Sequence, residues 1–290
     1  MSTATFLVQC LNAVQYGLLL FLVASGLTLI FGIMGVINLA HGSFYMLGAY
    51  LAFALAPWFG DWFVTRLVVG VALAAVFGYL LEWAFFSFLY ERDHLQQVLL
   101  TYALILVFEE LRSIAVGNEV HGVAAPAWLA GGFRLGGLME YPWYRVFASA
   151  ACLAVALALY ALVNRTRLGM MIRAGASNRD MARGLGVDIG RLYRIVFAGG
   201  VALAALAGMI AAPLSSVYPG MGSSVLIICF VVVVIGGIGS ITGALIASLL
   251  VGFVDTFGKV FAAEWSGVGV YVLMAIVLVW RPEGLMKRGF

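Results

Sequence analysis

The chain has 290 residues, of which 64% are hydrophobic and only 10% are charged. Soluble domains carry about 25% charged residues, so this chain has too little polar material to cover a soluble core, and an ordinary soluble protein is excluded. The formal net charge of +3 is small, and the basic residues form no continuous surface of the kind that binds nucleic acid.

Three long stretches, residues 1–60, 146–164 and 195–254, contain no Asp, Glu, Lys or Arg. A helix of about 20 apolar residues crosses the hydrocarbon core of a membrane. The sequence therefore predicts an all-α fold, a polytopic bundle of about eight or nine transmembrane helices that forms one domain over residues 1–290. The candidate spans are 10–33, 41–56, 67–89, 97–113, 144–163, 195–213, 224–238, 241–257 and 268–281.

Glycine interrupts the apolar runs at residues 32–35 and again at residues 236–239. Non-helical backbone is tolerated at membrane depth only where protein or a watery cavity surrounds it, so we expect the second and seventh spans to be broken or re-entrant. Three polar residues, Asn38, His41 and Ser43, follow the first break. Such groups are costly inside a membrane, and these three either line a solute path or satisfy the broken backbone.

Few acidic residues fall within the predicted spans. Glu82 is the most isolated of them, and we expect it to face the interior of the bundle. Glu109 precedes Arg112 by three residues, which predicts an ion pair on one helix face; the alternative is a polar contact along the solute path. Asp255 and Lys259, four residues apart, are expected to form a second pair of this kind.

Lys and Arg are unevenly distributed along the chain. Short loops that are rich in these residues stay on the cytoplasmic side of a membrane. We therefore expect the 164–194 loop and the C-terminus to lie inside the cell, with the 113–143 segment and the N-terminus outside. The basic residues behind this orientation are Arg165, Arg167, Arg173, Arg179, Arg183, Arg191, Arg194, Arg281, Lys287 and Arg288.

The most polar part of that loop reads RAGASNRDMARGLGVDIGRLYR. Asn178 is suited to cap a helix that begins at Arg179 and that carries an acidic residue in its first turn. This helix is expected to end at Gly184 or Gly186, and a second turn near Asp188 leads into the next span. The sequence thus predicts a short helix that lies across the cytoplasmic mouth of the bundle.

Apolar residues stand among the charges of this loop, at Leu185, Val187 and Leu192. A loop that only sets the membrane orientation needs positive charge and no apolar residues. An apolar centre with a polar rim is typical of a docking surface. We therefore favour a docking helix over a disordered basic linker.

The same loop continues into NRDMARGLGVDIGRLYRIVFAGGVALAALAG (178–208), which resembles the cytoplasmic coupling-loop region of importer permeases of the ABC class. It is most similar to the H-type subunit of the branched-chain amino-acid permease family. Two further stretches resemble that family's N-terminal and C-terminal signatures: GLTLIFGIMGVINLAHGSFYMLGAY (26–50) and VVVVIGGIGSITGALIASLLVG (231–252). Their order and spacing fit the family over its full length.

The resemblance implies one half of a two-permease pore in the lipid of a bacterial cytoplasmic (inner) membrane, served by two ATPase subunits and a periplasmic solute-binding protein. It favours a different, M-type chain as the second permease, with ATP and Mg²⁺ bound on the ATPases and no cofactor on this chain. The expected ATPase-coupling residues are Asn178, Arg179, Asp180, Met181, Ala182, Arg183, Gly184, Leu185, Gly186 and Val187. The residues expected along the solute path are Asn38, His41, Ser43, Glu82, Glu109, Gly236, Gly237 and Gly239.

No nucleotide-binding motif is visible, because the glycine-rich GGIGSITG lacks the lysine of a phosphate-binding loop. The chain is therefore expected not to be an enzyme, and no metal-ligand spacing is present. The resemblance admits branched-chain and other amino acids, urea, short amides and aromatic acids as solutes. The alternative is an ATP-independent channel or an ion-coupled carrier, for which Glu82 is the obvious coupling acid.

Overall fold

The computed structural model describes residues 3–90, 92–135 and 139–286, and helices make up most of this part of the chain. The all-α prediction is confirmed. The α-helices are α1 (Thr3–Met34), α2 (His41–Ala54), α3 (Ala56–Phe59), α4 (Phe63–Ala84), α5 (His94–Val116), α6 (Trp143–Arg165), α7 (Arg167–Ser177), α8 (Arg179–Gly184), α9 (Ile189–Ala211), α10 (Met221–Gly236), α11 (Ile241–Phe261) and α12 (Ser266–Trp280).

The segment between α5 and α6 contains structure that the sequence analysis missed. Two short strands, β1 (Gly132–Leu135) and β2 (Met139–Pro142), pair antiparallel with Gly132 opposite Pro142. Short 3₁₀ helices complete the regular structure of the described residues: η1 (Phe86–Phe88), η2 (Ala127–Leu129) and η3 (Ala263–Trp265). The strands are too few and too short to change the fold class.

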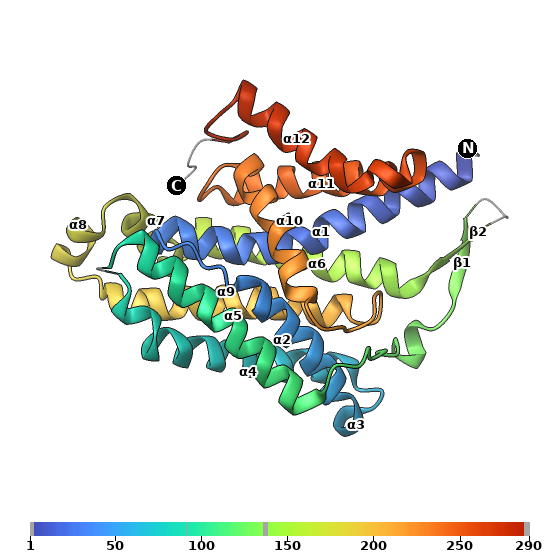
Figure 1. Cartoon of the computed structure of the whole chain (residues 1–290), viewed down its shortest axis with the longest axis horizontal. Coiled ribbons are helices and arrows are strands. Elements are labelled where there is room, and N and C mark those ends of the chain that lie inside the picture. The colour runs from blue at the N-terminus through green and yellow to red at the C-terminus, as the bar shows by residue number, and fades with distance from the viewer. Residues whose placement is uncertain (1–2, 91, 136–138, 287–290) are drawn as a thin grey trace.

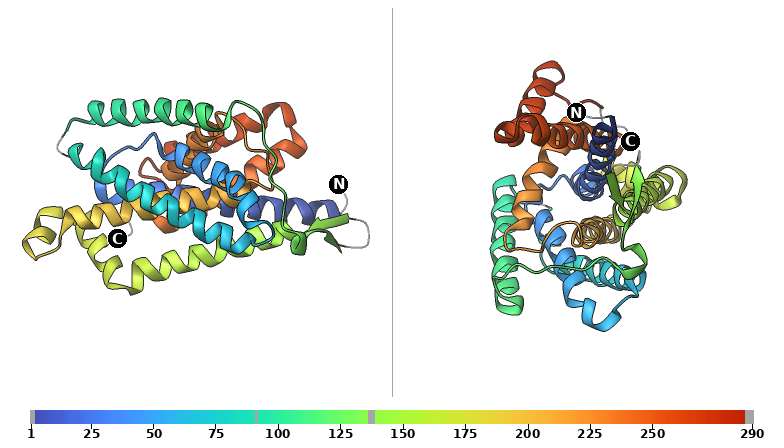
Figure 2. Two further views of the ribbon diagram at one scale, coloured as in Figure 1. Left: turned by 90° about the horizontal axis from the view of Figure 1, so that it is seen from below. Right: turned by 90° about the vertical axis from the view of Figure 1, so that its right-hand side faces the viewer.

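The long helices run roughly side by side, so the molecule has two ends (Figure 1). One end carries α7, α8 and the last described residues before the C-terminus, and we call it the basic end. The other carries α3, the β1–β2 pair and the start of α1, and we call it the hairpin end (Figures 1 and 2). The segments that the sequence assigned to opposite sides of a membrane therefore lie at opposite ends of the molecule.

Each candidate span contains a helix with similar bounds, and the second span is short because α2 begins only at His41. By length and apolar composition, five helical segments of the described chain can cross a membrane: Thr3–Met34, Phe63–Phe88, Trp143–Arg165, Ile189–Ala211 and Ile241–Phe261. Two shorter apolar helices accompany them, Met221–Gly236 and Gly267–Trp280. Many large apolar side chains on α4, α5 and α12 are exposed, as lipid-facing helices require.

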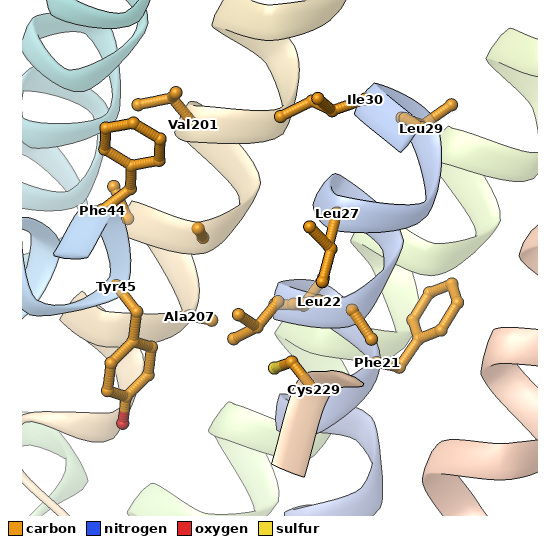
Figure 3. Close-up of a cluster of buried hydrophobic side chains, with 14 of the residues drawn as sticks. Phe21, Leu22, Leu27, Leu29, Ile30, Phe44, Tyr45, Val201, Ala207 and Cys229 are labelled. Atoms are coloured by element: carbon orange, nitrogen blue, oxygen red, sulfur yellow. The ribbon is translucent and has the colours of Figure 1, made fainter. Parts of the chain in front are cut away.

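The core is built around α1. In the most apolar 18-residue stretch of this helix, 94% is buried inside the protein. A helix that is hydrophobic all round is normally buried among other helices, and α1 packs against α6, α9, α10 and α11. Figure 3 shows the centre of this core, where Leu22 and Leu27 of α1 face Ala207 of α9, with Phe44 of α2 on the far side of α9.

Glycines let the central helices approach closely. A Cβ atom added at Gly48 of α2 would lie only 2.0 Å from the carbonyl oxygen of Ala205 in α9. One added at Gly26 of α1 would lie 2.6 Å from the carbonyl oxygen of Gly200, also in α9. Close backbone contact of this kind is the usual way to pack helices in lipid, where no hydrophobic force drives them together.

Candidate functional site

The polar loop of residues 164–194 is more ordered than the sequence predicted. The single short helix expected there is preceded by α7, which packs against the end of α6. The side-chain oxygen of Thr166 caps α7 by accepting a hydrogen bond from the Gly169 amide at 3.1 Å. Residues 167–177, which we had expected to form a loop, are therefore helical.

The predicted start of α8 is confirmed. The helix begins at Arg179, and the Asn178 side-chain oxygen accepts a hydrogen bond from the Met181 amide at 2.9 Å. Asp188 caps the following helix α9 in the same way, through a 2.9 Å bond from the Arg191 amide. These caps satisfy backbone donors that a helix start leaves free, so each helix begins at a defined residue.

The end of α8 is equally well defined. Gly186 adopts a φ of 89°, which is a left-handed conformation that other residues rarely take. Its amide donates to the carbonyl of Arg183 at 3.0 Å, and the Val187 amide donates to the carbonyl of Ala182 at 3.1 Å. This pair of bonds forms a Schellman motif, which stops the helix and turns the chain back toward α9.

Two apolar side chains of this region point away from the protein. Met181 is 66% exposed and Leu185 is 80% exposed, whereas Ala182 between them is buried. Leu192, which the sequence analysis grouped with Leu185, is also buried, and it packs against Gly175 of α7. The structure therefore excludes Leu192 from any exposed surface, because it packs between α7 and α9. Met181, one of the coupling residues expected from the sequence, is exposed beside Leu185.

The first two turns of α9 connect α8 to the bundle. The Tyr193 hydroxyl donates to the carbonyl of Ile33, at the end of α1, at 3.3 Å. The Tyr193 ring also packs edge to face against the ring of Tyr90, with 4.9 Å between centroids. Tyr90 lies in the turn between α4 and α5, so one residue next to α8 contacts two distant segments.

Glu82 lies at the basic end of α4, close to the same turn. Tyr90 donates a hydrogen bond to one carboxylate oxygen of Glu82, and the other lies 3.8 Å from Nε of Arg194 in α9. Burial and this hydrogen bond raise the pKa of the Tyr90 hydroxyl, which therefore remains protonated and donates. Glu82 is buried as we expected, and its partners connect it to the region beside α8.

The break before α2 is confirmed and lies within the bundle. Gly35 turns the chain with a φ of 66°, and α2 starts at His41, whose Nε2 donates to the carbonyl of Val23 at 2.9 Å. The Asn38 side-chain oxygen accepts from the Ala40 amide at 3.0 Å. Asn38, His41 and Ser43 are all buried. The structure thus brings these three predicted path residues together. Asn38 supports the irregular backbone before α2, and His41 connects the start of α2 to α1.

Helix α10 begins beside the start of α2. A Cβ added at Gly42 would lie 2.1 Å from the carbonyl oxygen of Gly222, so the two chains touch backbone to backbone. Both helices therefore start inside the molecule instead of at one of its ends (Figure 1). The second span is interrupted as expected, whereas the break expected in the seventh span at residues 236–239 is wrong: α10 is continuous, and these residues end it.

The glycines after α10 lie elsewhere, in the turn between α10 and α11 at the basic end. Gly237 and Gly239 have φ values of 96° and 83°, which form this turn. The segment 281–286 covers it, because the Leu285 amide donates to the carbonyl of Ile235 at 2.8 Å and the Met286 amide to that of Gly236 at 3.2 Å. These glycines are thus separate from Asn38, His41 and Ser43.

Glu109 occupies a fourth position, on the half of α5 toward the hairpin end. Its carboxylate lies 3.1 Å from Nε of Arg112, so the ion pair predicted from their spacing is confirmed. Arg112 also donates to the Gly117 carbonyl at 2.6 Å and to the Asn118 side chain at 2.9 Å. Glu109 therefore helps to hold the end of α5, and its part in a solute path remains a prediction.

The described residues contain no group of three or more His, Cys, Asp or Glu that could hold a metal ion. Broken helices that meet inside an apolar bundle are characteristic of membrane transport proteins, in which irregular backbone is enclosed by protein. At one end of the bundle, the capped helix α8 leaves Met181 and Leu185 exposed. The fold and the site together define a multi-pass membrane permease.

Comparison with known proteins gives the family. A family model described as "Branched-chain amino acid transport system / permease component" matches residues 9–278, and the chain belongs to this family. BraD of Pseudomonas aeruginosa, a high-affinity branched-chain amino acid transport system permease protein, is 29% identical, over 98% of this chain and 96% of its own. LivH of Escherichia coli is 28% identical over the same shares, and LivM of E. coli is 27% identical over 90% of this chain and 66% of its own.

Proposed function

We propose that this permease imports branched-chain amino acids or related small polar solutes, driven by ATP hydrolysis on separate subunits. The observation that carries the ATP-driven mechanism is α8, a capped helix outside the bundle with exposed Met181 and Leu185 among arginines. The branched-chain amino acids come from the names of BraD and LivH, which are similar over nearly their whole length.

The same comparison supports a second permease as a partner. LivH and LivM of E. coli are both named as permeases of a high-affinity branched-chain amino acid transport system, and both are similar to this chain. We infer a second, M-type permease beside this one, two ATPase subunits that bind ATP and Mg²⁺, and a soluble solute-binding protein. The basic end faces the cytoplasm of a bacterial inner membrane, as the distribution of Arg requires.

Movement of α8 is transmitted through α9. Tyr193 and Arg194, in the first two turns of α9, reach the end of α1 and the Glu82–Tyr90 pair respectively. An ATPase that contacts α8 differently in its two nucleotide states shifts the balance between two arrangements of these helices. Gly42 at the start of α2 and Gly222 at the start of α10 form an enclosed contact, and such a shift would open it.

The test replaces Met181 and Leu185 with Asp in the complete transporter. Charge on the apolar centre of the docking surface should prevent the ATPase subunits from co-purifying and abolish ATP-dependent uptake. Met170→Asp is the matched control, because Met170 is a methionine of α7 at the same end and is 55% exposed. Normal co-purification and uptake by the double variant would show that α8 is not the docking helix.

A second measurement separates ATP-driven import from the channel or carrier alternative. The permease pair is reconstituted in liposomes with and without the ATPase subunits, and the uptake of labelled leucine is followed. Uptake should require both the ATPases and ATP. Leucine uptake by the permeases alone would support the alternative and overturn the ATP-driven mechanism.

A further inference from the structure

A cavity of about 500 Å³ lies toward the hairpin end, between α1, α6, α10 and α11. We call it the chamber. None of the path residues expected from the sequence lines it, although Tyr45, two positions after Ser43, does. Its volume is several times that of a small solute, so it has room for an amino acid and water.

The chamber changes from polar to apolar along one face of α1. Gln9, Asn12 and Gln15 line the part nearest the hairpin end, and Leu19 and Val23 line the deeper part. Their spacing of three or four residues places them on one side of the helix. The Gln15 side chain is buried although it carries a polar amide. A solute that enters from the hairpin end therefore meets amides first and hydrocarbon below them.

Fixed charges of both signs surround the polar part. Arg145 of α6 donates to the Asn12 side-chain oxygen at 2.7 Å. Asp255 of α11 is buried and pairs with Lys259 at 2.5 Å, and the Lys259 ammonium lies 5.5 Å from the centre of the Tyr16 ring. Asn12 and Tyr16 are one helical turn apart, so two cations and one carboxylate line neighbouring levels of the chamber.

The deeper part of the chamber is mainly apolar. Leu20 and Val23 of α1, Val225 of α10 and Tyr45 of α2 contribute to its lining. The carbonyl of Val23 also accepts the hydrogen bond from His41, so the start of α2 lies directly against this floor. The chamber thus ends where the starts of α2 and α10 meet, at the contact that transport would have to open.

We propose that the chamber binds a zwitterionic α-amino acid with an apolar side chain, its ammonium group toward Asp255 and its carboxylate toward Arg145 and Lys259. The apolar side chain of the bound amino acid lies on the apolar floor, beside Leu20 and Val225. This proposal rests on the proposed function and gives that function a binding site in the permease itself. The Asp255–Lys259 ion pair and the Arg145–Asn12 hydrogen bond hold the charged groups in place when no solute is bound.

The same geometry rejects the other solutes that the family resemblance admits. Urea and short amides carry no charge for Asp255 or Arg145 and would cover little of the apolar floor. Aromatic acids carry a carboxylate but offer no cation to Asp255. An analogue that lacks one of the two charges loses a charge-assisted contact that an amino acid makes, and it should bind more weakly for that reason.

The test is protection of a cysteine in the chamber. Val225→Cys is introduced together with Cys10→Ser into the complete transporter, and a membrane-impermeant thiol reagent is applied from the side of the hairpin end. Cys152 and Cys229 are buried and stay in place. Millimolar leucine should slow labelling, whereas 4-methylpentanoate, 3-methylbutylamine and urea should not.

Asp255→Asn and Arg145→Gln, added to this background, should each raise the leucine concentration needed for half-protection by about tenfold, the effect expected for one lost charge-assisted contact. Glu140→Gln is the control, because it removes a carboxylate from the exposed Arg134–Glu140 ion pair of the β1–β2 hairpin, outside the chamber. Labelling that leucine does not slow, or protection that Asp255→Asn leaves unchanged, overturns the chamber as the binding site. Because labelling needs no ATP, either result leaves the ATP-driven mechanism to be judged by the uptake experiment.

Discussion

Single residues decide how closely the helices of this permease approach. Gly48 meets the backbone of Ala205, and Gly208 meets that of Tyr45, so α2 and α9 touch at two levels. Gly199 lies on the exposed side of the same α9, where an added Cβ would meet nothing within 4 Å. Glycine thus has a steric role at some positions of α9 and none at others.

Gly48→Val should separate α2 from α9. The larger side chain would overlap a carbonyl group, which cannot move as a flexible side chain can, and overpacking costs typically about 1–3 kcal/mol. The unfolding temperature of the purified protein in detergent should fall by several degrees. Gly199→Ala is the control and should leave it unchanged or slightly raised; equal effects of the two substitutions would contradict the close contact.

Glu82 gives a second prediction for single residues. The Glu82 carboxylate is buried and faces Arg194. The substitution Arg194→Gln therefore leaves this buried carboxylate without its cationic partner. This variant should be less stable than Glu82→Gln, and the double variant should be as stable as Glu82→Gln alone. Thermal unfolding of the three proteins measures the coupling, and additive effects would show that the two residues do not interact.

At the scale of elements, the pieces outside the bundle are fixed by their ends. Helix α8 has only six residues, and its geometry depends on Asn178 at the start and Gly186 at the finish. The segment 281–286 is held on the α10–α11 turn by two backbone hydrogen bonds. Neither piece has a core of its own, so small changes at these positions should alter it without unfolding the bundle.

Gly186→Ala should loosen α8. An L-residue in the left-handed conformation costs about 1–2 kcal/mol, and the Schellman motif would weaken by that amount. Amides of residues 182–187 should exchange faster with deuterium, and uptake per ATP hydrolysed should fall. Gly184→Ala, in the helical part and with open space around it, should do neither; a matching loss in both variants would argue against the motif.

Gly284→Ala should release the C-terminal segment. Gly284 has a φ of 84°, and its added Cβ would lie 2.5 Å from the Cα of Gly237. The amides of Leu285 and Met286 should then exchange faster. Gly267→Ala, at the start of α12 with no atom within 4 Å, serves as the control. Unchanged exchange in the Gly284 variant would show that the segment is held by other contacts.

For the whole molecule, the two ends differ in charge and in accessible partners. The described arginines of α7, α8 and the start of α9 gather at the basic end, and the β1–β2 pair marks the other. The chamber lies toward the hairpin end, and the α8 docking surface lies at the basic end. Solute and ATPase therefore act on opposite sides of the membrane in the proposed mechanism.

This orientation can be tested by labelling from each side. Leu185→Cys should react with an impermeant maleimide only in inside-out vesicles, because positive loops remain in the cytoplasm. Trp128 is 56% exposed near the hairpin end, so Trp128→Cys should react only in right-side-out vesicles. Both variants carry Cys10→Ser to remove background labelling. The opposite pattern would place the α8 docking surface outside the cell and exclude its contact with ATPases.

Local patterns were sufficient to predict much of this structure. The break before α2, the start of α8 at Arg179 and the Glu109–Arg112 pair all depend on residues within a few positions of one another. Helix α7 was missed because its glycines and arginines resemble a polar loop, whereas its burial of Ile172 depends on distant helices. The chamber was missed for the same reason, since Asn12, Arg145 and Asp255 meet only after the chain folds.

From Gly17 onward helix α1 is largely buried, and one of its main neighbours is α11, where Gly252 packs against the backbone of Gly17. Because α1 precedes α11 in the chain, it is synthesised earlier and enters the bilayer before the surface that α11 provides exists. A chain that stops before residue 241 would leave that side of α1 uncovered. The burial of α1 therefore depends on a segment that is made long after it.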